Sequence, residues 1–297
     1  MVPKFTGERP TTGLGTRMIT LNTAQEMRKY LGDDDGFYTG WTDRCINDLR
    51  TLFMKPDIQA VMEVVGTDGS IIDHFDERTL NPGHTTEGGW FVLEEARHRG
   101  NDPELIKVGC DMIDWAFARG WDKENGGMLY YTDVYNKPVQ EYWHNMKFWW
   151  PHDEALIAMT LAYKLTGEER YAIRHDMVRN WAFSHFQDVQ HGDWFGYLNK
   201  DGSRANTLKG SLWKSFFHHP SSPAPCGAAP TTAEPFKKKS NVSCREAIPY
   251  LRSGRFLCPQ RRMISSVRTT TSPGSSMALI REQKRNLPIS SALTEHS

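Results

Sequence analysis

The chain has 297 residues, of which 38% are hydrophobic and 24% are charged, values typical of globular proteins. Its formal net charge is zero, but residues 1–220 carry 24 Lys and Arg against 32 Asp and Glu, whereas residues 221–297 carry 12 against 4. These basic charges are scattered among Ser and Pro on no periodic helix, which argues against a nucleic-acid partner.

No run approaches the roughly 18 to 20 apolar residues that a membrane span needs, and residues 1–10 lack the apolar centre of a signal peptide. We therefore predict a cytoplasmic protein without a membrane partner. The five cysteines form no CxxC pair, so the sequence predicts neither a metal site nor a disulfide framework.

Helices are predicted from apolar periodicity in four stretches of the body, at 85–99, 103–119, 152–165 and 168–186. Gly100 and Gly167 stand where helix C-caps belong. Gly-rich connectors at 66–82, 120–138 and 191–208 separate the helix pairs, and the last two of them are typical of short β-hairpins.

A composition change near Pro220 divides the chain. All ten Trp precede it, and the following residues hold 13 Ser and 8 Pro but no Trp or Asp. Such a segment buries too little apolar area to offset its ordering entropy. We predict a folded domain at 1–220 and a disordered segment at 221–297.

An internal repeat determines the predicted architecture. Each connector ends in a histidine, at His84, His152 and His218, with spacings of 68 and 66 residues. Helix pairs recurring at this length, with histidines at one phase, are typical of a closed ring of helical hairpins. The predicted fold is all-α, an incomplete (α/α)6 toroid of helical hairpins with short β-hairpin connectors.

These three histidines are the main functional candidates. A histidine in the first turn of a helix feels the positive end of the helix dipole, which disfavours protonation and keeps the imidazole available as a base. Two such bases on opposite sides of a pocket can remove a proton from one face of a carbon and return it on the other. Five other histidines lack this phase and are interpreted as structural: His98, His144, His175, His185 and His191.

Other polar and aromatic candidates lie near the histidines. Glu87 follows His84 by three residues and Glu154 follows His152 by two, so each carboxylate can lie within a turn of its histidine. Lys147 could bind an anionic or enolate oxygen, although a solvated lysine explains it equally well. Six tryptophans flank the connectors or helix starts, where about two could stack on a sugar ring: Trp90, Trp121, Trp149, Trp150, Trp194 and Trp213.

The sequence resembles the N-acylglucosamine 2-epimerase family, also called renin-binding proteins, over about residues 71–220 and more weakly back to Arg17. The matching runs are NPGHTTEGGWF (81–91), GWDKENGGMLYY (120–131), MKFWWPHDEALIAM (146–159), GDWFGYLNKDG (192–202) and KGSLWKSFFHHP (209–220). Several long runs in the same order make the resemblance specific.

The resemblance implies an (α/α)6 barrel that interconverts N-acetylglucosamine and N-acetylmannosamine, with ATP as an allosteric activator, no required cofactor, and a homodimer. His84 and His218 match the family's two base histidines, and Pro220 favours His218 over His219. The surrounding substrate-binding positions match at Glu87, His152 and Glu154, to which the residue types add Lys147 and Trp150.

The chain also departs from the family. A ring of six hairpins at about 65 residues each needs close to 400 residues, so we expect that the family's N-terminal half is not present. We further expect that residues 221–297 arise from a retained intron or a shifted frame.

Two other functions fit the sequence. A non-catalytic homologue could bind a partner through exposed helical faces. A glycoside hydrolase on the same toroid could use Glu87 and Glu154 as its two carboxylates, but this leaves the histidine pairing unexplained.

Overall fold

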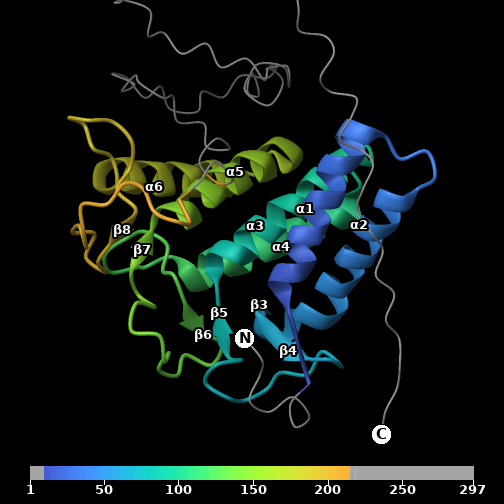
Figure 1. Cartoon of the computed structure of the whole chain (residues 1–297), viewed down its shortest axis with the longest axis horizontal. Helices are drawn as coiled ribbons and strands as arrows, with labels where there is room; N and C mark the ends of the chain where they lie inside the picture. The colour runs from blue at the N-terminus through green and yellow to red at the C-terminus, as the bar shows by residue number, and fades with distance from the viewer. Residues whose placement is uncertain (1–9, 215–217, 219–297) are drawn as a thin grey trace, which may run out of the picture. The chain divides into compact units, whose positions relative to one another are not determined.

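Three helical hairpins form the body of the protein in the computed structural model, which describes residues 10–214 and 218 (Figure 1). The first and second helix of each hairpin pack on each other, and α3 also contacts α1 and α5. The three first helices therefore lie in a row, each with its hairpin partner beside it. The helix bounds are α1 Leu14–Leu31, α2 Phe37–Asp48, α3 Pro82–His98, α4 Pro103–Gly120, α5 Trp149–Thr166 and α6 Glu169–His185.

Short antiparallel strand pairs repeat with the hairpins. In every unit, a strand just before the first helix pairs with a strand in the segment after the second helix, and these pairs are β1–β4, β5–β6 and β7–β8. The strands are β1 Thr11–Gly13, β2 Met54–Lys55, β3 Ala60–Val61, β4 Val64–Gly66, β5 Thr79–Leu80, β6 Thr132–Asp133, β7 Lys147–Phe148 and β8 Tyr197–Leu198. The internal repeat inferred from the sequence is thus present in the structure.

The first hairpin, α1 and α2, was not among the predicted helices. Its second helix continues into a π-helical turn at Leu49–Phe53, and β2 and β3 are joined by a 3-10 turn at Pro56–Ile58. The buried residues of α1 nevertheless recur at helical spacing, at Leu14, Met18, Leu21 and Ala24. Helix α1 packs against α2 and α3.

Local antiparallel bridges close the two predicted β-hairpin connectors. They join Trp121 with Met128 in the first, and Gln187 with Trp194 and Leu198 with Arg204 in the second. Their longer ladders run instead to strands that precede the hairpin, with Thr79 opposite Asp133 and Lys147 opposite Leu198. A local sequence pattern cannot reveal such partners, because the intervening helices bring them together.

Local sequence explains where the helices begin and end. At α3, the Asn81 side chain accepts a hydrogen bond from the His84 backbone N–H at 3.1 Å, and Pro82 occupies the first helical position, where its missing N–H costs little. Gly167 ends α5 at φ 71°, in the left-handed region that glycine favours. Helices α3 and α5 each begin three residues earlier than predicted.

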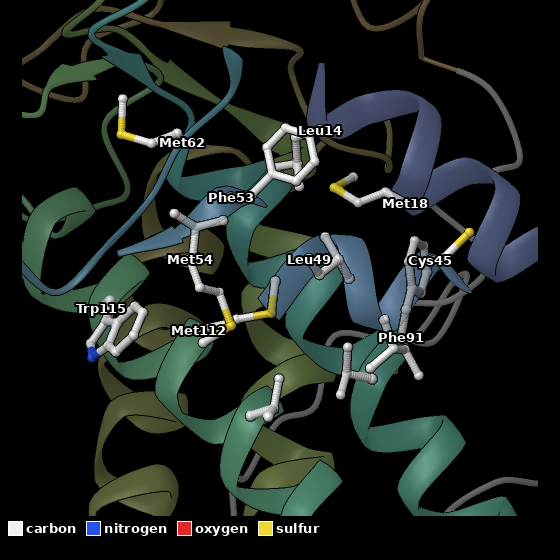
Figure 2. Close-up of a cluster of buried hydrophobic side chains, with 14 of the residues drawn as sticks. Leu14, Met18, Cys45, Leu49, Phe53, Met54, Met62, Phe91, Met112 and Trp115 are labelled. Atoms are coloured by element: carbon white, nitrogen blue, oxygen red, sulfur yellow. The ribbon is translucent and has the colours of Figure 1, made fainter. Parts of the chain in front are cut away.

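Two apolar cores stabilise the hairpins. Figure 2 shows the first, in which Leu14 and Met18 of α1, Leu49 and Phe53 after α2, and Phe91 of α3 meet among other buried side chains. The second core lies between α3, α4, α5 and α6 and includes Trp149, Tyr171 and Trp181. Residues 221–297, for which we predicted disorder, lie outside the described residues.

Among the described residues, no helix is both long enough and apolar enough to cross a bilayer.

Candidate functional site

The first part of the site lies at the start of α3. The Asn81 cap and Pro82 fix the first turn of this helix, and His84 follows as its third residue. Gly83 allows close packing, because a Cβ there would stand 2.5 Å from the ring of Trp150. Glycine thus lets the indole of α5 lie directly against the start of α3.

The second part comes from the start of α5 and from His218. The Trp150 ring has its centroid 5.1 Å from that of His84 and 5.2 Å from that of His218. His218 also places its Nδ1 2.7 Å from Oε1 of Glu154. One indole thus contacts both histidines, which come from repeat units far apart in the sequence.

Glu87 completes what we call the histidine–carboxylate cluster: His84, Glu87, Trp150, Glu154 and His218. Ligand atoms of Glu87, Glu154 and His218 all lie within 4.8 Å of one another. Five of the seven site residues predicted from the sequence therefore lie together. The other two, Lys147 and His152, are held elsewhere by their own partners.

Glu63 and Trp90 hold the cluster from outside, and only Trp90 was a candidate from the sequence. Glu63, between β3 and β4, places Oε2 3.0 Å from Nδ1 of His84. Trp90 donates its indole N–H to Oε2 of Glu154 at 2.6 Å. Glu63 gave no signal in the sequence, because it lies 21 residues before His84 and outside the repeated motif.

The charge state of His84 differs from the prediction. Burial alone would lower the pKa of His84, but Glu63, by charge and by hydrogen bond, and Glu154, by charge, outweigh it and raise that pKa. The helix dipole was expected to act in the opposite direction. A neighbouring carboxylate at hydrogen-bond distance is the stronger influence, so the imidazole of His84 is neutral only above a raised pKa.

Glu87 is a buried carboxyl group with 2% of its surface exposed. Burial, together with the charges of Glu154 and Glu63, raises its pKa from 4.5 to about 9. Glu87 is therefore protonated at neutral pH and can donate a hydrogen bond. Its Oε1 has no hydrogen-bond partner among the described residues.

His152 lies in the core rather than in the cluster. Its Nε2 accepts the Met128 backbone N–H at 2.9 Å, its Nδ1–H donates to the Phe148 carbonyl at 2.7 Å, and its ring stacks on Trp181. Burial lowers the pKa of His152 to about 3, so the ring is neutral. Residues two positions apart on a helix point in nearly opposite directions, so Glu154 faces the cluster while His152 turns away.

Lys147 does not reach the cluster. Its side chain is 0% exposed, and Nζ lies 2.6 Å from Oδ2 of Asp122. Lys147 is therefore not solvated, and its ammonium group binds a protein carboxylate rather than facing the cluster. Burial lowers the pKa of Lys147 in spite of this ion pair. The pair joins β7 to the connector after α4.

Of the six candidate tryptophans, Trp90 and Trp150 contact the cluster. Trp121 stacks on Phe117, and Trp194 stacks on Phe186. Trp149 is buried, and its ring centroid lies 5.5 Å from that of His218. Trp213 is exposed.

Comparison with known proteins finds relatives of this chain among sugar epimerases. The family model of N-acylglucosamine 2-epimerase matches residues 37–221. The N-acylglucosamine 2-epimerase of Rattus norvegicus is 35% identical over 226 residues, covering 75% of this chain and 53% of the rat protein, and that of Homo sapiens is 34% identical over 226 residues, covering 75% and 52%. The chain thus spans about half the length of these curated relatives.

Solved structures agree on the fold. A cellobiose 2-epimerase from Bacillus thermoamylovorans matches with a TM-score of 0.61 at 16% identity, covering 73% of this chain and 53% of that one. A D-mannose isomerase matches with a TM-score of 0.57 at 19% identity, covering 67% of this chain and 52% of that one. The predicted fold, a mainly helical, partial (α/α)6 toroid, is confirmed. The chain belongs to the N-acylglucosamine 2-epimerase family.

Proposed function

We propose that the protein is a sugar 2-epimerase that interconverts N-acetylglucosamine and N-acetylmannosamine by proton transfer at C2, with His84 and His218 as the two bases. The observation that carries the proposal is the pairing of two histidines around one indole, each bound to a carboxylate of its own. A carboxylate that accepts the Nδ1–H of a histidine leaves the lone pair on Nε2, which is the tautomer required of a base.

The proposed reaction uses the open-chain sugar. One histidine removes the C2 proton, the C2–H electron pair forms a C1=C2 double bond, and an enolate results with its negative charge on O1. The other histidine returns a proton to the opposite face of C2, which inverts that carbon and restores the carbonyl. General acid–base groups of this kind contribute typically about 10² to 10⁴ in rate.

Glu87 fits the stabilisation of the intermediate in this scheme. The carboxyl is neutral at pH 7 and lies close to Glu154 and His218, so it can donate a hydrogen bond to the developing charge on O1. Trp150 supplies an apolar surface beside both bases, on which a sugar ring can stack.

The choice of N-acetylhexosamine follows two relatives that are 35% and 34% identical over 226 residues and are named N-acylglucosamine 2-epimerases. A D-mannose isomerase from Pseudomonas cannabina is 33% identical, but over 137 residues. ATP as an activator, a homodimer and a cytoplasmic location stay predictions from the resemblance and the composition.

The test is proton NMR of N-acetylglucosamine in deuterium oxide with the purified chain, with and without ATP, following loss of the C2 proton signal. This readout detects single proton removals that a product assay misses. Exchange that appears with the chain supports the proposal. A chain that is folded by circular dichroism and yet exchanges no C2 proton would overturn it, and the non-catalytic homologue would then be preferred.

A further inference from the structure

Three side chains of the cluster form a set of metal ligands that sequence spacing gave no reason to expect. Glu87 comes from α3, Glu154 from α5 and His218 from the third repeat, and one ligand atom of each lies within 4.8 Å of the other two. Two carboxylate oxygens and one imidazole nitrogen are donors that Zn²⁺ and similar divalent transition metals accept.

A second observation points to a ligand at this place. Glu87 is 2% exposed, and its Oε1 has no hydrogen-bond partner among the residues that the structure describes. A buried polar oxygen without a hydrogen-bond partner costs free energy, so we expect a bound ligand to pair with it. Glu63 and Glu154 lie close enough to act on Glu87 by charge, so the surroundings of Oε1 are acidic.

We infer that Glu87, Glu154 and His218 form a binding site for a divalent transition metal ion, with Zn²⁺ as the preferred occupant. A metal with ligand bonds of about 2.0 to 2.2 Å needs its ligand atoms closer together than their present limit of 4.8 Å, so the side chains close around the ion by small rotations. The cation supplies a positive charge beside the three neighbouring carboxyl groups of Glu63, Glu87 and Glu154.

The site has a functional consequence that rests on the proposed function. A metal bound to His218 engages the imidazole that the proposed reaction needs as a base. Zn²⁺ is therefore an inhibitor of C2 proton exchange, and a chelator restores the exchange. Metal binding itself does not depend on that activity.

The test measures binding of Zn²⁺ by calorimetry and of Co²⁺ by visible absorption, with the full chain after treatment with EDTA and buffer exchange. The test variants are Glu87→Gln and His218→Ala. The matched control is His74→Ala, which removes a histidine that pairs with Glu77 away from the cluster. Gln keeps the shape and the neutral charge of Glu87, so that variant is expected to fold, which circular dichroism checks.

We expect one strong site in the parent chain and in His74→Ala, with affinity about 100-fold lower in Glu87→Gln and in His218→Ala, because loss of a ligand costs at least as much as loss of a group that orients one. Equal affinity in all four proteins would overturn the inference, as would the absence of a strong site in the parent. Binding without any C2 exchange would uphold the site and count against the proposed function.

Discussion

The starts of α3 and α5 are the most instructive comparison in this molecule. Each follows a short strand, each contains a proline, and each carries a histidine four residues after its strand ends, His84 after Leu80 and His152 after Phe148. Yet His84 contacts Trp150 in the cluster, whereas His152 is 0% exposed and binds two backbone groups.

The difference teaches that spacing in a repeat does not fix the direction of a side chain. Glu87 follows His84 by three residues and shares its side of the helix, but Glu154 follows His152 by two and faces roughly 200° away. In the second unit, α3 presents His84 and Glu87 to the site. In the third unit, α5 presents Trp150 and Glu154, which are four residues apart, and His152 stabilises the core instead.

The largest expected effect is on activity. His84→Ala and His218→Ala should each reduce the rate of C2 exchange by about 10² to 10⁴ or to below detection, because each removes a base. The NMR exchange assay measures the rate, and circular dichroism checks the fold. Unchanged exchange in either variant would remove that histidine from the mechanism.

The next largest effect is on stability and tests the structural role of His152. His152→Ala should lower the free energy of unfolding by about 2 to 4 kcal/mol, because the Met128 N–H and the Phe148 carbonyl lose their buried partner. Urea unfolding measures this change in the free energy of unfolding. His98→Ala, at an exposed position of α3, is the control and should stay within about 0.5 kcal/mol. A similar small loss in His152→Ala would contradict the structural role.

A change of pH dependence would sharpen the assignment of His84. Glu63 raises the pKa of His84, so Glu63→Gln should lower that pKa and shift the acid limb of the exchange rate to lower pH. The measurement is the exchange rate from pH 5 to 9. If the limb stays in place, His84 is not the group that titrates in it.

The smallest effect concerns Glu87. Its folded pKa of about 9 exceeds the ordinary 4.5, so the folded state holds an extra proton and the parent loses stability as pH rises between these values. In EDTA, Glu87→Gln should therefore gain melting temperature relative to the parent by a few degrees at pH 8 and by less at pH 5. Glu94→Gln, on the same helix outside the cluster, should show no such trend. A gain that does not depend on pH would contradict the buried, protonated state of Glu87.

Much of the fold was predictable because its signals are local. The periodic apolar residues of α3 to α6, the capping positions at Gly100 and Gly167, and the recurrence of the unit all depend on neighbours a few residues apart. The strand pairs were not predictable, because β5 and β6 meet only after the hairpin between them has folded. The α1–α2 hairpin was missed, although the buried residues of α1 recur at helical spacing.

By itself, the sequence determined the class of fold, the repeat, and the motif residues that meet in the cluster, His84, Glu87, Trp150, Glu154 and His218. Only the tertiary structure decided which partner each charged group has. It pairs His84 with Glu63 and Lys147 with Asp122, and it turns His152 into the core. The reason is physical: helix periodicity acts over a few residues, whereas the pKa of a group and the partners of a buried polar atom depend on side chains that only packing brings near.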